Sequence, residues 1–315
     1  MKKLPLALLV PAFALAWALP PRLTAQTVNP LQVALLKWAP ASGIAFPVGS
    51  GPLGLAFDGA AMWVANFTSF SITKLRASDG AVLGTFGLAN SPNGVAYDGA
   101  NLWVTTGGNA VIKLRGSDGA VLGTFAVGAN PVGVAFDGAN VWVANAGSNT
   151  VTKLRASDGV VLGTFAVGND PLYLAYDGAQ VWVSNENSNS VTKLRASDGV
   201  SLGTFKVGSM PVGIAFDGTH VWVANSGSNS VTKLRARDGA TLGTFPVGQR
   251  PAGVVFDGAS VWVSNQVGNS VTRLPASDDG MVLGTFAVGG APMAMAFDGA
   301  NVWVAQLAAG TVSKL

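Results

Sequence analysis

The chain has 315 residues, no cysteine, one histidine and a formal net charge of +3 at pH 7. The lack of cysteine excludes disulfides, thiolate metal sites and thiol redox chemistry, and one histidine cannot build a catalytic triad or a histidine metal centre without partners. Lys2, Lys3 and Arg22 lie in the first 25 residues, so 16 of the 19 basic residues remain beyond them against 16 acidic ones. This balance predicts no nucleic-acid partner.

The N-terminus reads as a secretion signal. Lys2-Lys3 precedes an apolar run, Leu4 to Leu19, and Leu23-Thr24-Ala25 is an acceptable cleavage site. An uncut membrane anchor is the less favoured alternative, because the run contains prolines and is shorter than the about 20 residues that a spanning helix needs. We therefore predict a signal peptide over 1–25, a lead-in segment over 26–41, and an exported protein, periplasmic or secreted, without stable membrane insertion after signal removal.

A repeat of about 40 residues fills the chain from Ser50 onward. Two landmarks recur once in each unit, a proline and a tryptophan inside a pentamer of the type Val-Trp-Val-Ala-Asn. The prolines are Pro52, Pro92, Pro131, Pro171, Pro211, Pro251 and Pro292, and the tryptophans are Trp63, Trp103, Trp142, Trp182, Trp222, Trp262 and Trp303. Such a regular period predicts an array in which no unit buries its apolar face alone.

Each unit predicts four short strands, called a, b, c and d here. In the third unit they are Gly133 to Phe136, Val141 to Ala144, Val151 to Arg155 and Val160 to Phe165. Asp-Gly pairs follow strands a and c, where the aspartate caps its own turn and the glycine takes positive φ. Four antiparallel strands per 40 residues is the period of a β-propeller blade, and no helical period competes with it.

Counting the strands predicts how the ring closes. Seven a-b-c sets are present but only six d strands lie between them, and the last set stops at strand c, Thr311 to Leu315. The segment Ile44 to Gly49 precedes the first strand a and can supply the missing d strand of the last blade. We predict an all-β fold, a seven-bladed propeller over residues 42–315 that is closed by this N-terminal strand.

The units resemble those of the YVTN-type seven-bladed propeller family over about residues 42–315. The resemblance rests on Val-Trp-Val-Ala-Asn in place of the family signature and on runs such as Gly227 to Thr232 and Thr204 to Gly208. A looser similarity extends to NHL-repeat and streptogramin B lyase-type propellers. The first family implies an exported scaffold of varied role, whereas lyase resemblance would imply two histidines and a glutamate at a magnesium site, which this chain cannot supply. One departure is a basic residue in every strand c, at Lys74, Lys113, Lys153, Lys193, Lys233, Arg273 and Lys314.

Repeated residues favour structural roles. We expect the turn aspartates to cap turns, the strand c cations to reach turn carboxylates or water, and the tryptophans to fill the widening gap between blades. The single histidine, His220, is expected to be an exposed turn residue. No residue is predicted to be catalytic or to bind a metal, and no cofactor is predicted.

Deviations between repeats mark the candidate site. The b-c and d-a loops vary, and in a four-stranded antiparallel blade both emerge on the same face, around one mouth of the channel. The candidate ligand or partner residues are Tyr173, Asp170, Glu186, Arg250, Gln266, Phe67, Phe70 and Met210. Drift among duplicated repeats is the alternative explanation of this variation.

Two functions remain open. The favoured one is a monomeric, non-catalytic scaffold whose loops bind a protein, a glycan or a small ligand. The other is a lyase or hydrolase in which Asp170 and Glu186 act as acid and base with a recruited metal. It requires that the two carboxyl groups lie about 5–10 Å apart in a shared cleft. A structural role in a surface layer is a third possibility.

Overall fold

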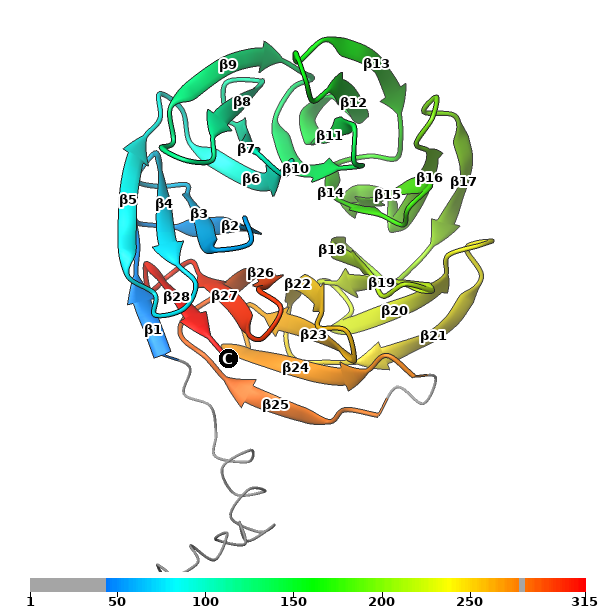
Figure 1. Ribbon diagram of the computed structural model, residues 1–315. Coiled ribbons are helices and arrows are strands. Elements are labelled where there is room, and N and C mark those ends of the chain that lie inside the picture. Colours follow the sequence, from blue (N-terminus) through cyan, green and yellow to red (C-terminus); the bar gives the residue numbers. More distant parts are fainter. Residues whose placement is uncertain (1–43, 278–280) are drawn as a thin grey trace, which may run out of the picture. The chain divides into compact units, whose positions relative to one another are not determined.

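The computed structural model describes residues 44–277 and 281–315, which form seven four-stranded antiparallel sheets arranged radially (Figure 1). The predicted seven-bladed propeller is confirmed. The predicted signal peptide and lead-in segment lie outside the described residues. No helix among the described residues is long and apolar enough to cross a membrane.

The blades follow one another along the chain with strand a innermost and strand d outermost (Figure 1). The a strands are β2 Pro52–Phe57, β6 Pro92–Tyr97, β10 Pro131–Phe136, β14 Pro171–Tyr176, β18 Pro211–Phe216, β22 Pro251–Phe256 and β26 Pro292–Phe297. The b strands are β3 Ala61–Asn66, β7 Asn101–Thr106, β11 Asn140–Asn145, β15 Gln180–Asn185, β19 His220–Asn225, β23 Ser260–Asn265 and β27 Val302–Gln306.

The outer half of each blade repeats in the same way. The c strands are β4 Ser71–Arg76, β8 Ala110–Arg115, β12 Thr150–Arg155, β16 Ser190–Arg195, β20 Ser230–Arg235, β24 Ser270–Pro275 and β28 Thr311–Lys314. The d strands are β5 Val82–Gly87, β9 Val121–Ala126, β13 Val161–Ala166, β17 Ser201–Lys206, β21 Thr241–Pro246, β25 Gly284–Ala287 and, in blade seven, β1 Ile44–Pro47. Two short 3-10 helices, Ala146–Ser148 and Glu186–Ser188, lie in b-c loops.

The turn aspartates cap the a-b turns as predicted and also hold the tryptophans. Oδ1 of Asp137 accepts hydrogen bonds from the backbone N–H groups of Ala139 and Asn140, at 2.9 and 2.6 Å. Its Oδ2 accepts a third from the indole Nε1 of Trp142 at 2.8 Å. Burial raises the pKa of Asp137, but the Trp142 and backbone donors outweigh it and leave the pKa below its ordinary value. One carboxylate thus shapes the turn and orients the core ring.

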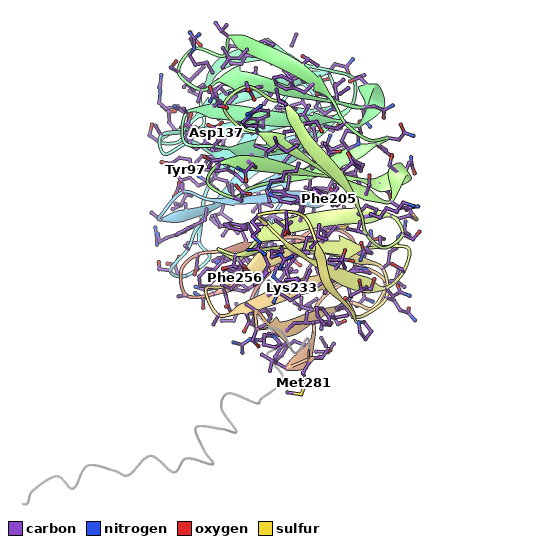
Figure 2. The ribbon with its side chains drawn as sticks, turned by 90° about the vertical axis from the view of Figure 1, so that its right-hand side faces the viewer. Tyr97, Asp137, Phe205, Lys233, Phe256 and Met281 are labelled. Carbon is purple, nitrogen blue, oxygen red and sulfur yellow. The ribbon has the colours of Figure 1, made fainter. Side chains whose placement is uncertain are left out.

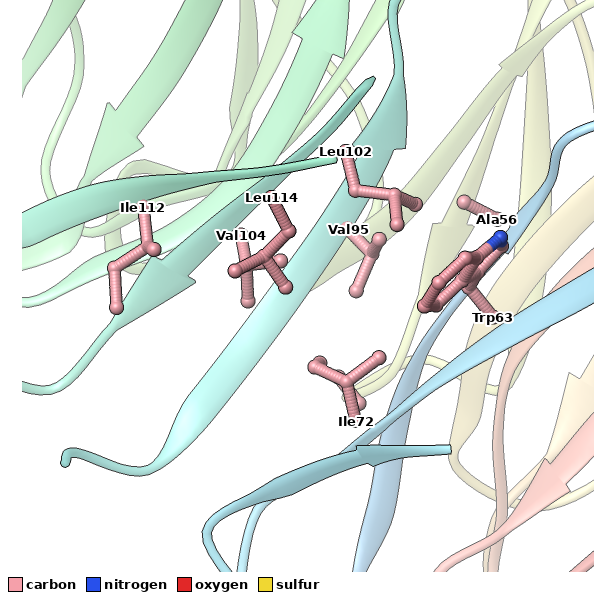
Figure 3. Packing of buried hydrophobic residues seen from close by; sticks show 9 residues of the cluster. Ala56, Trp63, Ile72, Val95, Leu102, Val104, Ile112 and Leu114 are labelled. Carbon is pink, nitrogen blue, oxygen red and sulfur yellow. The ribbon is translucent and has the colours of Figure 1, made fainter. Parts of the chain in front are cut away.

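The tryptophans fill the space between blades, which confirms the expected packing role. Trp63 is fully buried, and Ile72 of its own blade joins it in a cluster with Val95 and Leu102 of blade two (Figure 3). All but one of the seven tryptophans are fully buried, and the exception is Trp262. Each cluster therefore belongs to two blades, so no blade has a complete core of its own.

The strand c cations link neighbouring blades, which the sequence did not predict. Two of them also reach turn carboxylates as expected, since Lys74 lies 3.6 Å from Asp58 and Arg273 3.8 Å from Asp257. Lys153 is 5% exposed, and its Nζ lies 5.0 Å from the centre of the Trp142 ring. The same Nζ donates hydrogen bonds to the carbonyl oxygens of Ala196 and Ser197 in the next blade, at 2.6 and 3.1 Å. Arg273 differs, because it donates to Ser260 of its own blade. Blade seven takes its outer strand from β1 and so has no c-d turn to offer the equivalent carbonyl.

The ring closes through the N-terminal strand, as predicted. β1 pairs antiparallel with β28, with Ile44 opposite Lys314 and Pro47 opposite Thr311. Phe46 stacks on Trp303 with ring centres 5.6 Å apart, in the same way that the d-strand phenylalanines stack on the tryptophans of the other blades. Blade seven is therefore as complete as its neighbours.

Candidate functional site

The b-c and d-a loops share one face of the ring, called the loop face here. Backbone bonds show this directly, since Glu186 N–H donates to the Asp170 carbonyl and Gln266 N–H to that of Arg250, both at 2.9 Å. The a-b and c-d turns form the opposite face. Figure 2 shows the ring from the side, with Tyr97 and Asp137 of the a-b turn side at the left.

An asparagine in most b-c loops holds the next d-a loop. Asn149 adopts φ 55°, and its Oδ1 accepts a hydrogen bond of 2.9 Å from Asp170 N–H. Asn229 holds Arg250 in the same way at 2.8 Å. Asparagine tolerates this left-handed conformation better than other non-glycine residues, so it suits a tight loop that must also offer an acceptor. The rim of the channel is thus fixed by side chain to backbone bonds.

Blade one breaks this pattern. Phe70 occupies the asparagine position at φ 50° and is 49% exposed, and Phe67 of the same loop is 39% exposed. A bulky residue at positive φ is strained, and both phenylalanines leave much of their ring surface in water. This loop therefore carries a conformational cost that the asparagine of the equivalent loops avoids.

The acidic candidates lie together in blade four. Asn187 Nδ2 donates to Asp170 Oδ2 at 3.0 Å, and Glu186 is partly buried beside them. Burial raises the pKa of Glu186 above its ordinary value, the Asp170 carboxylate raises it further, and Arg250 lowers it. Arg250 lies in the d-a loop before blade six and Glu186 in the b-c loop of blade four, so the charge of Arg250 acts on a carboxylate of another blade. The structure thus places Asp170 and Glu186 in adjoining loops, where the charge of Arg250 also acts on Glu186.

Tyr173 lies deeper, in the wall of the central channel. The channel holds a cavity of about 190 Å³. Apart from Tyr173, every residue that lines it is glycine, alanine, valine, leucine, isoleucine or methionine. Burial raises the pKa of the Tyr173 phenol. Within the described residues its hydroxyl makes no hydrogen bond, and it is not sealed from the channel.

The position of Tyr173 explains why its equivalents are small. In most blades this site is glycine, and a Cβ on Gly133 would clash with the Leu172 carbonyl oxygen of the next blade. In blade four the neighbouring carbonyl belongs to Val212 and accepts a 2.6 Å hydrogen bond from Ser184 Oγ, as the equivalent carbonyls of Val132 and Met293 do from Thr105 and Ser264. Blade four thus contributes the Tyr173 phenol to the channel wall, where the equivalent residues of the other blades are glycines and Ala294.

The remaining candidates stand at separate points of the loop face. Gln266 Nε2 contacts the sulfur of Met293, a channel-lining residue, at 3.2 Å. Met210 is 36% exposed beside the b-c loop of blade five. Sequence reasoning missed Asn187, the partner of Asp170, and the apolar channel wall, although the alternate apolar residues of strand a were a signal for it.

His220 and the acidic side chains are residues that could take part in acid-base or metal chemistry. His220 starts a b strand on the opposite face, where its Nδ1 lies 3.2 Å from Asp217 Oδ2; with 18% of its side chain exposed, it is less open than expected. Over residues 44–277 and 281–315, no three His, Cys, Asp or Glu side chains are grouped to hold a metal ion.

Comparison with known proteins supports the fold. No family model matches the chain, and no curated protein matches it. Virginiamycin B lyase from Staphylococcus aureus superposes with a TM-score of 0.74 at 17% identity, over 86% of this chain and 97% of that one. A streptogramin B lyase gives 0.73 at 18%, over 87% and 95%, and Kuenenia stuttgartiensis hydrazine synthase gives 0.75 at 18%, over 84% and 95%. At this identity the likeness shows the fold alone: the chain is a seven-bladed β-propeller.

Proposed function

We propose that this protein is an exported, non-catalytic propeller scaffold that binds a protein, a glycan or a small ligand through the loop face. One observation carries the proposal. The charged group of Asp170, Glu186 and Arg250 lies on the face at which an apolar channel with a single phenol opens. A mostly apolar hollow with a few placed polar groups is the usual composition of a ligand site.

The blade-one loop supports the proposal independently. Phe67 and Phe70 are exposed on the same face, and Phe70 is held in a strained conformation. Exposed aromatic residues on a rigid scaffold are typical anchors for a partner, and strain in a loop often accompanies function. Sequence drift among the duplicated repeats, the alternative explanation, gives no reason for a strained loop with exposed aromatic residues.

Affinity capture from the native envelope and culture fluid tests the proposal. The unmodified protein is compared with the combined variant Tyr173→Ala, Glu186→Ala, Arg250→Ala and Phe70→Ala. A matched control replaces four exposed residues of the opposite face, Arg76, Arg155, Asp198 and Arg237, with alanine. Melting curves must show that all three proteins are folded at the temperature of the capture experiment. We expect a protein or glycan that the unmodified and control proteins retain and the loop variant loses. Equal recovery by all three would contradict the loop face as a binding surface.

A lyase or hydrolase is the second candidate, because the pKa of Glu186 is raised beside Asp170. Two neighbouring carboxyl groups with separated pKa values can act as acid and base. The similar virginiamycin B lyase has been crystallised with quinupristin, so this antibiotic is the appropriate probe. Incubation with quinupristin and Mg²⁺ should give a cleaved product that Glu186→Gln abolishes if this candidate holds. An unchanged antibiotic would remove it.

A further inference from the structure

We propose that the central channel binds a small molecule with one aromatic ring and one hydrogen-bond acceptor, held between Tyr173 and the methionines of blade seven. The inference rests on the proposed function and deepens it, since it names a ligand class for the hollow at the loop face. It rests on the size of the channel, its lining and its one polar side chain.

The size of the cavity sets the size of the ligand. A cavity of 150 Å³ lined by leucine, isoleucine and phenylalanine stays dry and binds benzene. The channel cavity of about 190 Å³ has a similar aliphatic lining, including Leu174, Ile214 and Val254. Backbone groups of the lining glycines offer polar contacts as well, and a ring with a short substituent fills the volume and removes the aliphatic part of the lining from water.

Tyr173 supplies the polar anchor. It is the one lining residue with a polar side chain, and within the described part of the chain its hydroxyl has no hydrogen-bond partner. A tyrosine phenol is neutral near pH 7, and burial raises the pKa of Tyr173 further, so its O–H can donate a hydrogen bond to an acceptor on the ligand. The hydroxyl is open to the channel, so a carbonyl or ether oxygen on the ligand can accept its hydrogen bond.

Two methionines favour an aromatic ligand over an aliphatic one. Met293 and Met295 line the cavity from β26, and thioether sulfur makes favourable contacts with aromatic rings. Gln266 contacts the sulfur of Met293 from the b-c loop of blade six. Methionine is also adaptable, so the wall can close around rings with different substituents.

Acetophenone and ethylbenzene test the inference, because they share a ring and nearly the same shape but only acetophenone carries an acceptor. Binding is measured by NMR titration of the full chain. We expect saturable one-site binding of both, and Tyr173→Phe should weaken acetophenone about fivefold to tenfold while leaving ethylbenzene unchanged. Ala294→Phe should abolish both, because the ring fills the channel at a position that already carries a Cβ.

Three results would overturn the inference: no binding by the unmodified protein, binding that survives Ala294→Phe, or equal loss of both probes on Tyr173→Phe. Melting curves verify that the variants are folded. Capture experiments with Ala294→Phe separate this inference from the proposed function. If Ala294→Phe still captures the partner but the native protein binds neither probe, only the channel inference fails. If the probes bind but no partner is captured, only the loop-face proposal fails.

Discussion

At the scale of single residues, the tryptophans set the distance between blades. Trp182 is fully buried and packs with Val191 of its own blade and Ile214 and Val221 of the next. We predict that Trp182→Ala lowers the free energy of unfolding by roughly 3–5 kcal/mol, because a large cavity opens between two sheets. Denaturant unfolding measures this. Trp262→Ala, at the one incompletely buried position, should cost less. Equal stability of the native and Trp182→Ala proteins would contradict the packing role.

The Glu186 carboxyl group gives the loop face a pH dependence. Its pKa is raised in the folded protein, chiefly by burial, so the folded state holds the proton to higher pH than the unfolded state does. Ionised Glu186 therefore costs stability, and the cost develops as pH rises above the unfolded pKa of about 4.3. Glu186→Gln should raise the melting temperature at pH 7 and change it little at pH 3.5.

A second carboxylate serves as the control for this prediction. The pKa of Asp238 is lowered to about 2, chiefly by its hydrogen bond with Arg235. Asp238→Asn should therefore lower the melting temperature at pH 7, with an effect that disappears as the pH approaches 2. The two substitutions should thus act in opposite directions, and a common direction would show that Glu186 is not destabilised by its surroundings.

At the scale of elements, the b-c loop of blade one combines a strained backbone at Phe70 with two exposed aromatic side chains. Phe70→Asn introduces the residue that the equivalent loops use at positive φ, so we predict that it stabilises the protein by about 1 kcal/mol. The reverse substitution, Asn149→Phe, should destabilise it by at least as much, because a loop hydrogen bond is lost as well. Thermal melts compare the three proteins. If Phe70→Asn also abolishes partner capture, the loop is a site where stability was exchanged for binding.

The lysine links between blades give a second prediction at this scale. Lys153→Met keeps most of the apolar stem but removes the hydrogen bonds to Ala196 and Ser197, and should cost about 1.5–3 kcal/mol. Arg273→Met is the matched control, since Arg273 bonds only within its own blade, to Ser260 and Asp257. Urea unfolding should separate the two variants. Equal costs would show that the link across blades adds nothing.

At the scale of the molecule, β1 makes the ring continuous. Removal of residues 1–48 leaves β28 as an open edge and takes Phe46 away from Trp303, so we predict a lower melting temperature and aggregation through the exposed strand. Removal of residues 1–40 should leave the melt unchanged, because β1 is retained. Scanning calorimetry with light scattering measures both effects. A full-stability melt after the longer truncation would contradict closure by β1.

The repeat made the fold predictable, but only part of the site. Proline, tryptophan and Asp-Gly recur in every unit, and each is required by local geometry, so strands, turns and ring closure could be inferred. The hydrogen-bond partner of Lys153 could not be inferred from the sequence, because it lies in the next blade and depends on how the sheets are spaced. The interaction of Glu186 with Arg250 depends on the curvature of the ring for the same reason. Comparison of repeats finds unusual residues but does not show which of them meet in space.

The pairing of β1 with β28 also governs the order of events in folding. In chain order β1 precedes and β28 follows every other strand of the propeller, so blade seven cannot be completed until the strands of the other six blades have been made. Blades one to six can stack in turn meanwhile, since each buries its core against the previous one. Until β28 meets β1, the growing propeller remains an open arc in which β1 is unpaired. The step that closes the ring is thus the pairing of β1 with β28, and its timing decides when the channel is first enclosed on all sides.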